Sequence, residues 1–497
     1  MKNYFYITTP IYYVNDKPHI GHAYTTILAD VISRYKRKLG KETFFLTGLD
    51  EHGQKVQEAA EKLGVDPKKH CDKMAPRFTS LWDKLHISND DFIRTTEDRH
   101  KKIVKKILQI VMENGDIYEA EYEGLYSVSE ERFITEKEAE SGAYRDIKTL
   151  KEKNYFFRMS KYQKQLIKHI HSNPKFIQPN HRKNEILGFL QKPLNDLCIS
   201  RPKSRLSWGI ELPFNKEYVT YVWFDALINY ITAAGYANDE KLFKRRWPAS
   251  CHLIGKDILT THAVYWPTML MSAGIDLPES IFAHGWWLMG ESKMSKSLGN
   301  IINPMDLIDD YGVDPVRYYL MREMVIGQDA SFTLESFIQR YNSDLANDFG
   351  NLLSRVTTLI HKNFAGKIPE PGELPKEALS IKSKSVELST LVTQMTNEMR
   401  LNDAIEEIMQ FIRGVNKYME KNAPWKMVKE DKVSAGTVLY TACEALRIGA
   451  VLLSPVMPNR TLILLEVLNS DKVNYSWGGL VSGAKLKDHD PLFPRVK

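Results

Sequence analysis

The order of apolar and polar positions in the first 60 residues predicts two strands separated by a helix. Short apolar runs occupy residues 4–7 and 43–47. Between them, residues 21–38 carry apolar side chains at every third or fourth position, which is the spacing of a helix with one buried face. Residues 8–18 contain two prolines and are predicted to form a loop. A strand, a helix and a second strand in this order are typical of a parallel sheet.

The same pattern returns after residue 215. Predicted strands at 219–223, 252–254 and 280–283 are each followed at once by polar or aromatic residues. In doubly wound sheets, ligands bind in the crevice outside the carboxyl ends of the strands. We therefore predict an α/β fold with one Rossmann-type parallel sheet, split by an insertion over residues 116–215, and a ligand site at its carboxyl edge.

From about residue 345 to residue 468 the apolar spacing becomes continuously helical. One stripe is formed by Phe349, Leu352, Leu353, Val356 and Ile360. Stripes of this width bury one side of each helix against its neighbours. The sequence therefore predicts an α-helical bundle that follows the sheet domain.

Charge is distributed unevenly along the chain. The 497 residues carry a net charge of +6, but residues 148–205 alone hold fourteen Lys and Arg against three acidic residues. In the rest of the chain acidic residues outnumber basic ones, 59 to 54. A local excess of positive charge suits a surface that faces a polyanion. The alternative is an ordinary solvated face rich in lysine.

The four cysteines, Cys71, Cys198, Cys251 and Cys443, are scattered and contain no C-x-x-C pair. This spacing argues against a disulfide framework and against a cysteine zinc site, and it fits a reducing compartment. No run of eighteen apolar residues occurs, so we expect no membrane span. The first predicted strand begins near residue 4, so we expect no leader peptide and a cytoplasmic protein.

Two short motifs place phosphate-seeking groups where an anion could approach. Residues 19–22 read His-Ile-Gly-His at the predicted start of a helix, where unpaired N–H groups and the helix dipole favour anions. Residues 293–297 read Lys-Met-Ser-Lys-Ser in a polar stretch flanked by glycines. Two ammonium groups there would stabilise charge on a leaving pyrophosphate. The alternatives are a packed turn for the first motif and an exposed lysine loop for the second.

Together, in this order and on this fold, the two motifs resemble the HIGH and KMSKS motifs of class I aminoacyl-tRNA synthetases. Segments 9–15, 48–53, 221–226 and 255–257 look like the methionyl-tRNA synthetases in particular, so the resemblance extends along nearly the whole chain. It implies ATP-dependent ligation of L-methionine to its initiator and elongator tRNAs through a methionyl-adenylate, with release of AMP and pyrophosphate. It also implies that Mg²⁺ accompanies ATP.

The resemblance carries the family's site residues onto matching positions of this chain. The implied catalytic residues are His19, His22, Lys293 and Lys296. The implied ATP site contains these four residues together with Gly21, Gly255 and Asp257. The implied methionine site is formed by Ile11, Tyr13, Asp50, Trp223, Ala226, Tyr230 and His284. The implied anticodon-binding residues are Asn351, Arg355 and Trp425.

These implied roles agree with the chemistry of the side chains. An aromatic wall with few charges suits a thioether, and the Asp50 carboxylate suits an ammonium group. Asn351 and Arg355 are four residues apart, so both face the same way from one helix and can hydrogen-bond to unstacked bases. Trp425 is suited to stacking on a base, although a Trp after a proline also suits a plug between helices.

The resemblance also implies a division into regions. These are 1–115 and 216–290 for the two halves of the catalytic domain, 116–215 for the inserted connective domain, 291–345 for the KMSKS loop and stem-contact region, and 346–497 for the anticodon-binding domain with its C-terminal tail.

Two features depart from many family members. Ser127 and Glu130 stand where those members have a zinc-binding cysteine pair, so we predict no zinc. The chain ends soon after the helical bundle, which leaves no room for the module that dimerises some members. We therefore expect a monomer.

Three other functions compete with this interpretation. A small-substrate nucleotidyltransferase shares His-x-Gly-His but would not need the helical domain. A different class I synthetase would need an editing insertion or zinc ligands that are absent here. A tRNA-binding protein without catalysis would have no need of His19, His22, Lys293 and Lys296. A pyrophosphate-exchange assay across amino acids separates all of these.

Overall fold

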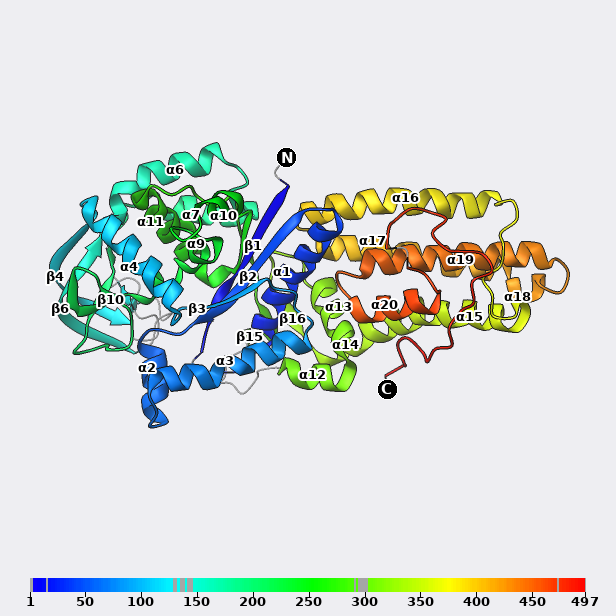
Figure 1. The fold of residues 1–497 in the computed structure, drawn as a ribbon, viewed down its shortest axis with the longest axis horizontal. Helices are drawn as coiled ribbons and strands as arrows, with labels where there is room; N and C mark the ends of the chain where they lie inside the picture. Colours follow the sequence, from blue (N-terminus) through cyan, green and yellow to red (C-terminus); the bar gives the residue numbers. More distant parts are fainter. Residues whose placement is uncertain are drawn as a thin grey trace. The chain divides into compact units, whose positions relative to one another are not determined.

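The computed structural model describes residues 3–14, 17–127, 132–134, 139–140, 146–289, 292–293, 303–471 and 473–496. It divides into two compact units (Figure 1). The sheet unit comprises residues 1–18, 36–83 and 87–284, and the helical unit comprises residues 19–35, 84–86 and 285–497. The five predicted regions stay a prediction.

A six-stranded sheet forms the centre of the sheet unit, in the order β3-β2-β1-β12-β13-β7. Every neighbouring pair in it is parallel, so the predicted parallel fold is confirmed. Its strands are β1 (Tyr4–Tyr13), β2 (Glu42–Asp50), β3 (Asp91–Arg94), β7 (Ile177–Gln178), β12 (Cys251–Gly255) and β13 (Ile281–His284).

The strand β1 is longer than predicted. The expected loop at 8–18 instead continues the strand to Tyr13, with a register shift against β2 between Thr8 and Ile11. Pro10 lies inside this shift. Because proline has no N–H to donate to a ladder, a bulge is where a strand tolerates it. The strand therefore reaches beyond the proline and carries Ile11 and Tyr13 to its carboxyl end.

The predicted strand at 219–223 was wrong in its place and its extent. Strand β11 (Asn215–Thr220) pairs antiparallel with β10 (Glu211–Leu212) and β9 (Ser200–Pro202) in a separate small sheet. Val222 already begins the helix α8 (Val222–Ala226). A short apolar run does not distinguish a strand from the first turn of a buried helix, because both place all of its side chains inside.

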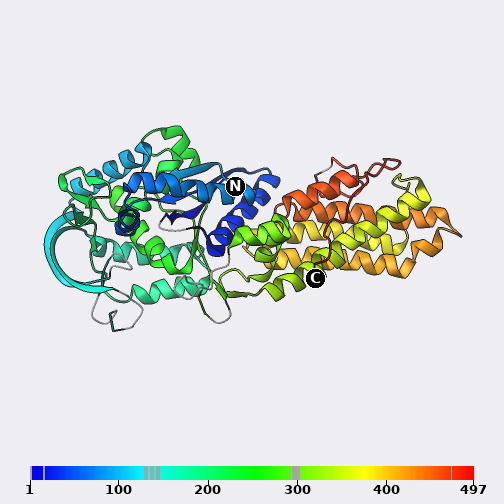
Figure 2. The ribbon, with the colours of Figure 1, turned by 90° about the horizontal axis from the view of Figure 1, so that it is seen from below.

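The region predicted as an insertion contains a long antiparallel pair of strands. Strands β4 (Ile117–Ser127) and β6 (Ile147–Phe157) form the cyan arc in Figure 2. The short strands β5 (Arg132–Ile134) and β8 (Leu197–Cys198) extend this sheet. Helices α6 (Gln163–Ser172) and α7 (Asn180–Phe189) follow, and β7 between them pairs with β13 of the central sheet.

The central strands share one apolar core with the helices packed on them. Buried members of this core include Leu46, Ile93, Val104 and Ile254. Besides α6 and α7, the described helical segments of the sheet unit include α2 (Gln54–Lys62), α3 (Pro67–Lys84), α4 (Asp98–Glu113), η1 (Met159–Tyr162), α8, α9 (Asn229–Ala234), α10 (Glu240–Arg246), η2 (Lys256–Ile258), the π-helical η3 (Thr261–Tyr265) and α11 (Trp266–Ala273).

The helical unit confirms the predicted bundle. Helices α16 (Lys376–Asn397), α17 (Leu401–Asn422) and α19 (Lys432–Leu453) pack against one another along their lengths (Figures 1 and 2). The unit contains α12 (Pro304–Tyr311), α13 (Val313–Glu323), α14 (Leu334–Arg340), the π-helical η5 (Tyr341–Gly350), α15 (Asn351–Phe364), α16 (Lys376–Asn397), α17 (Leu401–Asn422), α18 (Pro424–Met427), α19 (Lys432–Leu453), α20 (Pro458–Val467) and the small sheet of β14 (Trp287–Met289), β15 (Ser292–Lys293) and β16 (Ala330–Phe332).

Within the described ranges one helix, α19, has the length and hydropathy of a membrane span. The whole of its apolar window is buried in the protein. Its contacts with α16, α17 and α20 make it the core helix of the bundle.

Most of the helix α1 (Ile20–Lys38) belongs to the helical unit, and it matches the predicted helix at 21–38. A fully buried ion pair holds it there. Arg317 on α13 donates to the Asp30 carboxylate at 2.7 Å and to the carbonyl oxygens of Leu85, Pro455 and Val456. A buried charge is tolerated only when it is paired and hydrogen-bonded in this way. This contact fixes the position of α1 in its unit.

Candidate functional site

The carboxyl edge of the parallel sheet brings together predicted site residues that are far apart in sequence. At the ends of β1 and β2, Tyr13 lies opposite Asp50 in the ladder register. At the ends of β12 and β13, Gly255 lies opposite His284. Because all these strands run in the same direction, the four residues share one edge of the sheet. This edge is where the sequence predicted a ligand site.

Aromatic rings extend along this edge. Trp223 on α8 contacts Tyr13 edge-on, with ring centroids 6.3 Å apart and planes at 77°. The same indole contacts His262 on η3, with ring centroids 6.4 Å apart. The buried Tyr230 on α9 donates its hydroxyl proton to His262 Nε2 at 2.7 Å. We call Tyr13, Trp223, Tyr230 and His262 the aromatic wall.

His262 is a member of this wall that the sequence interpretation missed. Its Nδ1 donates to the carbonyl oxygen of Ile258 at 3.0 Å, so Nε2 is free of a proton and accepts from Tyr230. Burial lowers the pKa of His262 to about 4. One feature of the sequence could have pointed to His262. It stands four residues, about one helical turn, after Ile258, in the segment that follows Gly255-Lys256-Asp257.

Gly255, Asp257 and His284 lie close to one another at the neighbouring strand ends. A Cβ atom on Gly255 would lie 2.6 Å from Asp257 Oδ1 and 3.8 Å from His284 Cε1. Glycine is therefore what allows the Asp257 carboxylate to approach the strand. His284, which was predicted in the methionine site, contacts this group, whereas the ring contacts to Trp223 and Tyr230 are made by His262.

Residues 19–22 lie at the start of α1 in the helical unit. The rings of His19 and His22 stack, with centroids 3.9 Å apart. The Gly21 N–H donates to His19 Nδ1 at 3.1 Å, and the His19 N–H donates to His22 Nδ1 at 3.2 Å. Both rings thus carry their proton on Nε2, where it can be donated to a phosphate oxygen. Loss of solvation, together with the neighbouring His19, lowers the pKa of His22.

The second motif is described only in part. The backbone of Lys293 ends β15, opposite Leu288 of β14. The side chain of Lys293 and the whole of Lys296 lie outside the described residues. The predicted closure of the two lysines on His19 and His22 therefore stays a prediction.

The predicted anticodon residues lie on two helices that meet. Asn351 and Arg355 are on α15, Asn351 exposed and Arg355 partly so. The guanidinium of Arg355 lies 5.5 Å from the Trp425 ring centroid and 3.7 Å from Glu420. Trp425 on α18 is 37 % exposed, which is a high value for an indole. The Arg355 guanidinium and the Trp425 indole, two of the three predicted anticodon-binding groups, therefore share one accessible surface.

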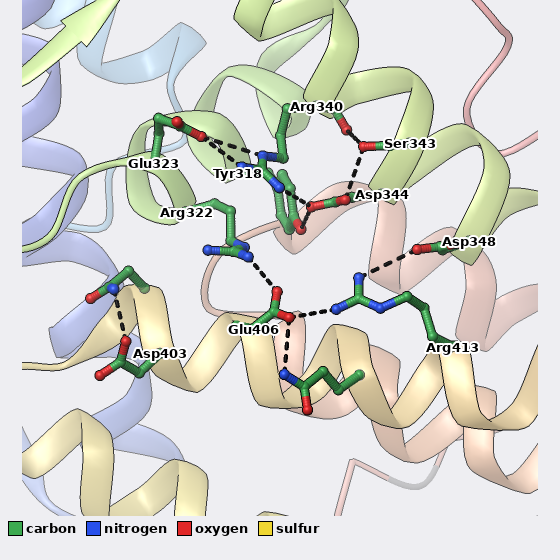
Figure 3. Close-up of polar contacts among 12 residues, drawn as sticks. Tyr318, Arg322, Glu323, Arg340, Ser343, Asp344, Asp348, Asp403, Glu406 and Arg413 are labelled. Atoms are coloured by element: carbon green, nitrogen blue, oxygen red, sulfur yellow. Dashed lines mark hydrogen bonds and ion pairs between the residues drawn. The ribbon is translucent and has the colours of Figure 1, made fainter.

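A network of charged side chains packs the segment leading into α15 against its neighbours (Figure 3). Arg413 on α17 donates to Glu406 at 2.6 Å and to Asp348 of η5 at 3.4 Å, and Arg322 of α13 also pairs with Glu406. The amide of Asn416 donates to the Asp348 carbonyl oxygen at 2.9 Å. Asp348 is three residues before Asn351, so these contacts fix where α15 begins.

No group of three or more His, Cys, Asp or Glu is arranged to hold a metal ion within the described part of the chain. Ser127 lies at the end of β4, and Glu130 lies outside the described residues. The absence of zinc stays a prediction from the sequence.

Comparison with known proteins identifies the family. Residues 5–143 and 138–357 match the family described as tRNA synthetases class I (M), and residues 368–489 match the anticodon binding domain of methionyl tRNA ligase. The methionine--tRNA ligase of Fusobacterium nucleatum is 47% identical, over 100% of this chain and 80% of that protein. That of Rickettsia conorii is 44% identical over 100% of both chains.

Solved structures agree with these matches. The Mycobacterium tuberculosis methionyl-tRNA synthetase in complex with methionyl-adenylate has a TM-score of 0.95 and 41% identity, and covers 100% of both chains. Its apo form has a TM-score of 0.88 and 37% identity. The chain therefore belongs to the methionyl-tRNA synthetase family of class I aminoacyl-tRNA synthetases.

Proposed function

We propose how the residues described above divide the work of this enzyme. As a methionine--tRNA ligase, the chain joins L-methionine to tRNA in two steps, through a methionyl-adenylate. In our proposal the aromatic wall, together with Ile11 and Ala226, holds the thioether side chain. Asp50 holds the substrate ammonium, and His284 closes the site beside Gly255.

The observation that carries this proposal is the combination at one sheet edge. Tyr13 of the wall and Asp50 face each other across adjacent strands. The wall carries no charge near neutral pH, because its one titratable imidazole has a pKa of about 4. An uncharged aromatic surface beside the Asp50 carboxylate suits an amino acid with a flexible, polarisable side chain.

ATP would bind with Mg²⁺, and its phosphate oxygens are ligands of the kind that Mg²⁺ prefers. His19 and His22 would donate their Nε2 protons to the phosphates, with Gly21 leaving room for the approach. Asp257 and Gly255 would hold the nucleoside. Lys293 and Lys296 would stabilise the charge that develops on pyrophosphate.

The chemistry needs no nucleophile from the protein. The methionine carboxylate attacks the α-phosphorus of ATP, the bond to pyrophosphate breaks, and the terminal ribose hydroxyl of tRNA then displaces AMP from the carbonyl carbon. The contribution of the protein is therefore orientation and electrostatic stabilisation. Asn351, Arg355 and Trp425 would read the anticodon of the initiator and elongator tRNAs.

We further propose that the protein works as a monomer in the cytoplasm. All four cysteines are free and buried, which suits a reducing compartment. Light scattering coupled to size-exclusion chromatography should give the mass of one chain, and a mass of two chains would contradict the proposal.

The proposed roles are tested by ATP–pyrophosphate exchange. The wild-type chain should exchange pyrophosphate with methionine and not with the other amino acids. Lys296→Ala should slow the exchange by about a hundredfold or more, since it removes a charge that acts in the transition state, and should leave the KM for methionine nearly unchanged.

Lys384→Ala removes an exposed lysine from α16 and is the matched control, with no expected effect on the exchange. Normal exchange in Lys296→Ala would contradict the role given to Lys296. Exchange with another amino acid in place of methionine would contradict the substrate.

A further inference from the structure

A buried carboxylate in the sheet unit accepts hydrogen bonds from two histidines. His52 Nδ1 lies 2.6 Å from Asp225 Oδ2, and His100 Nε2 lies 2.6 Å from Asp225 Oδ1. Asp225 and His100 are completely buried, and His52 is 5 % exposed. We call these three residues the His–Asp–His clamp. No role in the reaction proposed above uses it.

The clamp connects the two segments that carry most of the proposed methionine site. His52 stands two residues after Asp50, in the loop at the end of β2. Asp225 lies within α8, between Trp223 and Ala226. His100, on α4, holds the other carboxylate oxygen from the body of the unit.

The charge state of the clamp follows from its hydrogen bonds. Burial alone would raise the pKa of Asp225, but the two imidazoles more than offset this effect, and the pKa lies below its ordinary value. The carboxylate is therefore ionised, and each ring nitrogen that faces it carries a proton. Charge-assisted hydrogen bonds of this kind are about twice as strong as neutral ones, and they fix the orientation of both partners.

The loop that carries Asp50 and His52 is also fixed on its other side. The Glu51 carboxylate is buried and accepts from Arg94 at 2.7 Å. The indole N–H of Trp208 donates to the Glu51 carbonyl oxygen at 2.5 Å, and its ring packs against the His52 ring, with centroids 5.3 Å apart. The loop is thus held rigidly, and the clamp transmits its position to α8.

Two other functions of the clamp are excluded by its geometry. Nitrogen and oxygen atoms 2.6 Å apart are hydrogen-bonded directly and are too close to act as neighbouring ligands of one metal ion, each of which would lie about 2 Å from the metal in a tetrahedron. Both Asp225 oxygens and both imidazole N–H groups that face them are already used within the clamp, so it offers a substrate no open donor.

We propose that the His–Asp–His clamp is a positioning device that sets the separation of Asp50 from Trp223 and Ala226, and thereby the affinity for methionine. This inference rests on the methionine site proposed above. Asp225, His52 and His100 are positioning residues in it. A site held by such contacts loses about a hundredfold in rate for a misplacement of 1 Å, so a broken clamp should be visible in steady-state kinetics.

The test compares variants of the full-length protein in methionine-dependent pyrophosphate exchange. Asp225→Asn and His52→Leu should each raise the KM for methionine by about tenfold or more, since both lose a hydrogen bond of the clamp, while the KM for ATP stays as in wild type. His52→Asn places an amide N–H where Nδ1 now stands, so it should restore most of the affinity that His52→Leu loses.

Asp116→Asn is the matched control. Asp116 is also completely buried in the sheet unit, where Lys161 and Ser272 donate to it at 2.6 and 2.8 Å. It lies on none of the segments that carry the proposed methionine site. Its replacement should lower the unfolding temperature, as Asp225→Asn will, without changing the KM for methionine.

Each outcome decides one question. If Asp225→Asn and His52→Leu lower the unfolding temperature but keep the wild-type KM for methionine, the clamp only stabilises the fold and the inference fails. If Asp225→Asn does not fold, the comparison of His52→Asn with His52→Leu decides, and equal KM values overturn the inference. If the wild-type chain shows no methionine-dependent exchange, the proposed function itself fails.

Discussion

Two buried histidines beside the proposed methionine site, His252 and His262, are each fixed in one neutral tautomer by hydrogen bonds at both ring nitrogens. The indole N–H of Trp266 donates to His252 Nε2 at 3.2 Å, so His252 must donate from Nδ1 to Thr8 Oγ1, which lies 2.8 Å away. Burial also lowers the pKa of His252 well below its ordinary value. His262 is fixed in the same tautomer, with its proton on Nδ1, which donates to the Ile258 carbonyl oxygen. The aromatic wall and the neighbouring His252 are therefore uncharged at physiological pH.

This neutrality predicts a specific loss of stability in acid. In the unfolded chain His262 takes up a proton near pH 6.5, whereas in the folded protein its pKa is about 4. The unfolded state binds more protons between these two values, so stability falls as the pH drops from 6.5 towards 4. Between about pH 7.5 and about pH 5 this single group should cost about 2 kcal/mol.

Urea unfolding at those two pH values measures the effect. His262→Gln keeps an acceptor for the Tyr230 hydroxyl and removes the titration, so the variant should lose less stability on acidification than the wild type does. Equal losses in the two proteins would show that His262 does not titrate in this window.

At the scale of elements, the sequence predicted the helices and strands that have a recognisable spacing of apolar residues. Helix α1, the four central strands β1, β2, β12 and β13, and the bundle of α15 to α20 were each recognisable from spacing. Strand β7 has two residues, which is too short for any period to appear. The helix α8 has five residues, and the pattern placed Trp223 at the end of a predicted strand instead of in this helix. Trp223 and Ala226 were therefore assigned to the site by resemblance alone.

The spacing of apolar residues also does not predict that α15 and α18 contact each other. Ala423 caps α17 in the left-handed region, with φ 42°, and Pro424 begins α18. A non-glycine residue in this conformation costs about 1–2 kcal/mol and persists because surrounding contacts hold it. The sharp turn is what brings Trp425 to within 5.5 Å of the Arg355 guanidinium.

This arrangement predicts separable effects on the two substrates. Trp425→Ala removes an exposed ring. If that ring stacks on an anticodon base, a contact worth about 1–3 kcal/mol, the KM for tRNA should rise by about fivefold to about 150-fold. Methionine-dependent pyrophosphate exchange should be unchanged.

Leu462→Ala removes another exposed apolar side chain of the same unit, on α20, and should affect neither reaction. If Trp425→Ala left the aminoacylation kinetics unchanged but lowered the unfolding temperature, Trp425 would be a plug between helices, as the sequence alone also allowed.

At the scale of the whole molecule, the resemblance supplied more of the site than spacing did. Tyr13, Asp50, Gly255 and His284 could be predicted to share an edge, because the carboxyl ends of parallel strands always do. His262 could not, since its place depends on how η3 packs on Trp223, two segments almost forty residues apart. Side-chain contacts of that kind have no signature in the local sequence.

The structure also changes the interpretation of the basic stretch at 148–205. Many of its cations are paired with acidic residues: Lys153 with Glu119, Lys161 with Asp116, and Lys203 with Glu211. In contrast, Lys164 and Lys168 are exposed on α6 and form no ion pair with another described residue. They are four residues apart and face the same way from the helix. Lys175 and Lys192 are likewise exposed and form no ion pair with another described residue, but Lys164 and Lys168 present two such charges on one helix face and are the pair that we test for contact with tRNA phosphates.

Salt dependence distinguishes phosphate contacts from diffuse charge. Each contact adds about 0.7–0.9 to the slope of log K against log salt, so the double variant Lys164→Ala/Lys168→Ala should flatten that slope by about 1–2 in tRNA binding. The double variant Lys153→Ala/Lys203→Ala removes the same net charge from paired positions and should leave the slope as in wild type. Equal flattening in both would mean that tRNA senses only the total charge. An unaltered slope in both variants would show that the exposed face of α6 does not contact tRNA. Only lysines that displace counterions from phosphates contribute to the slope of log K against log salt.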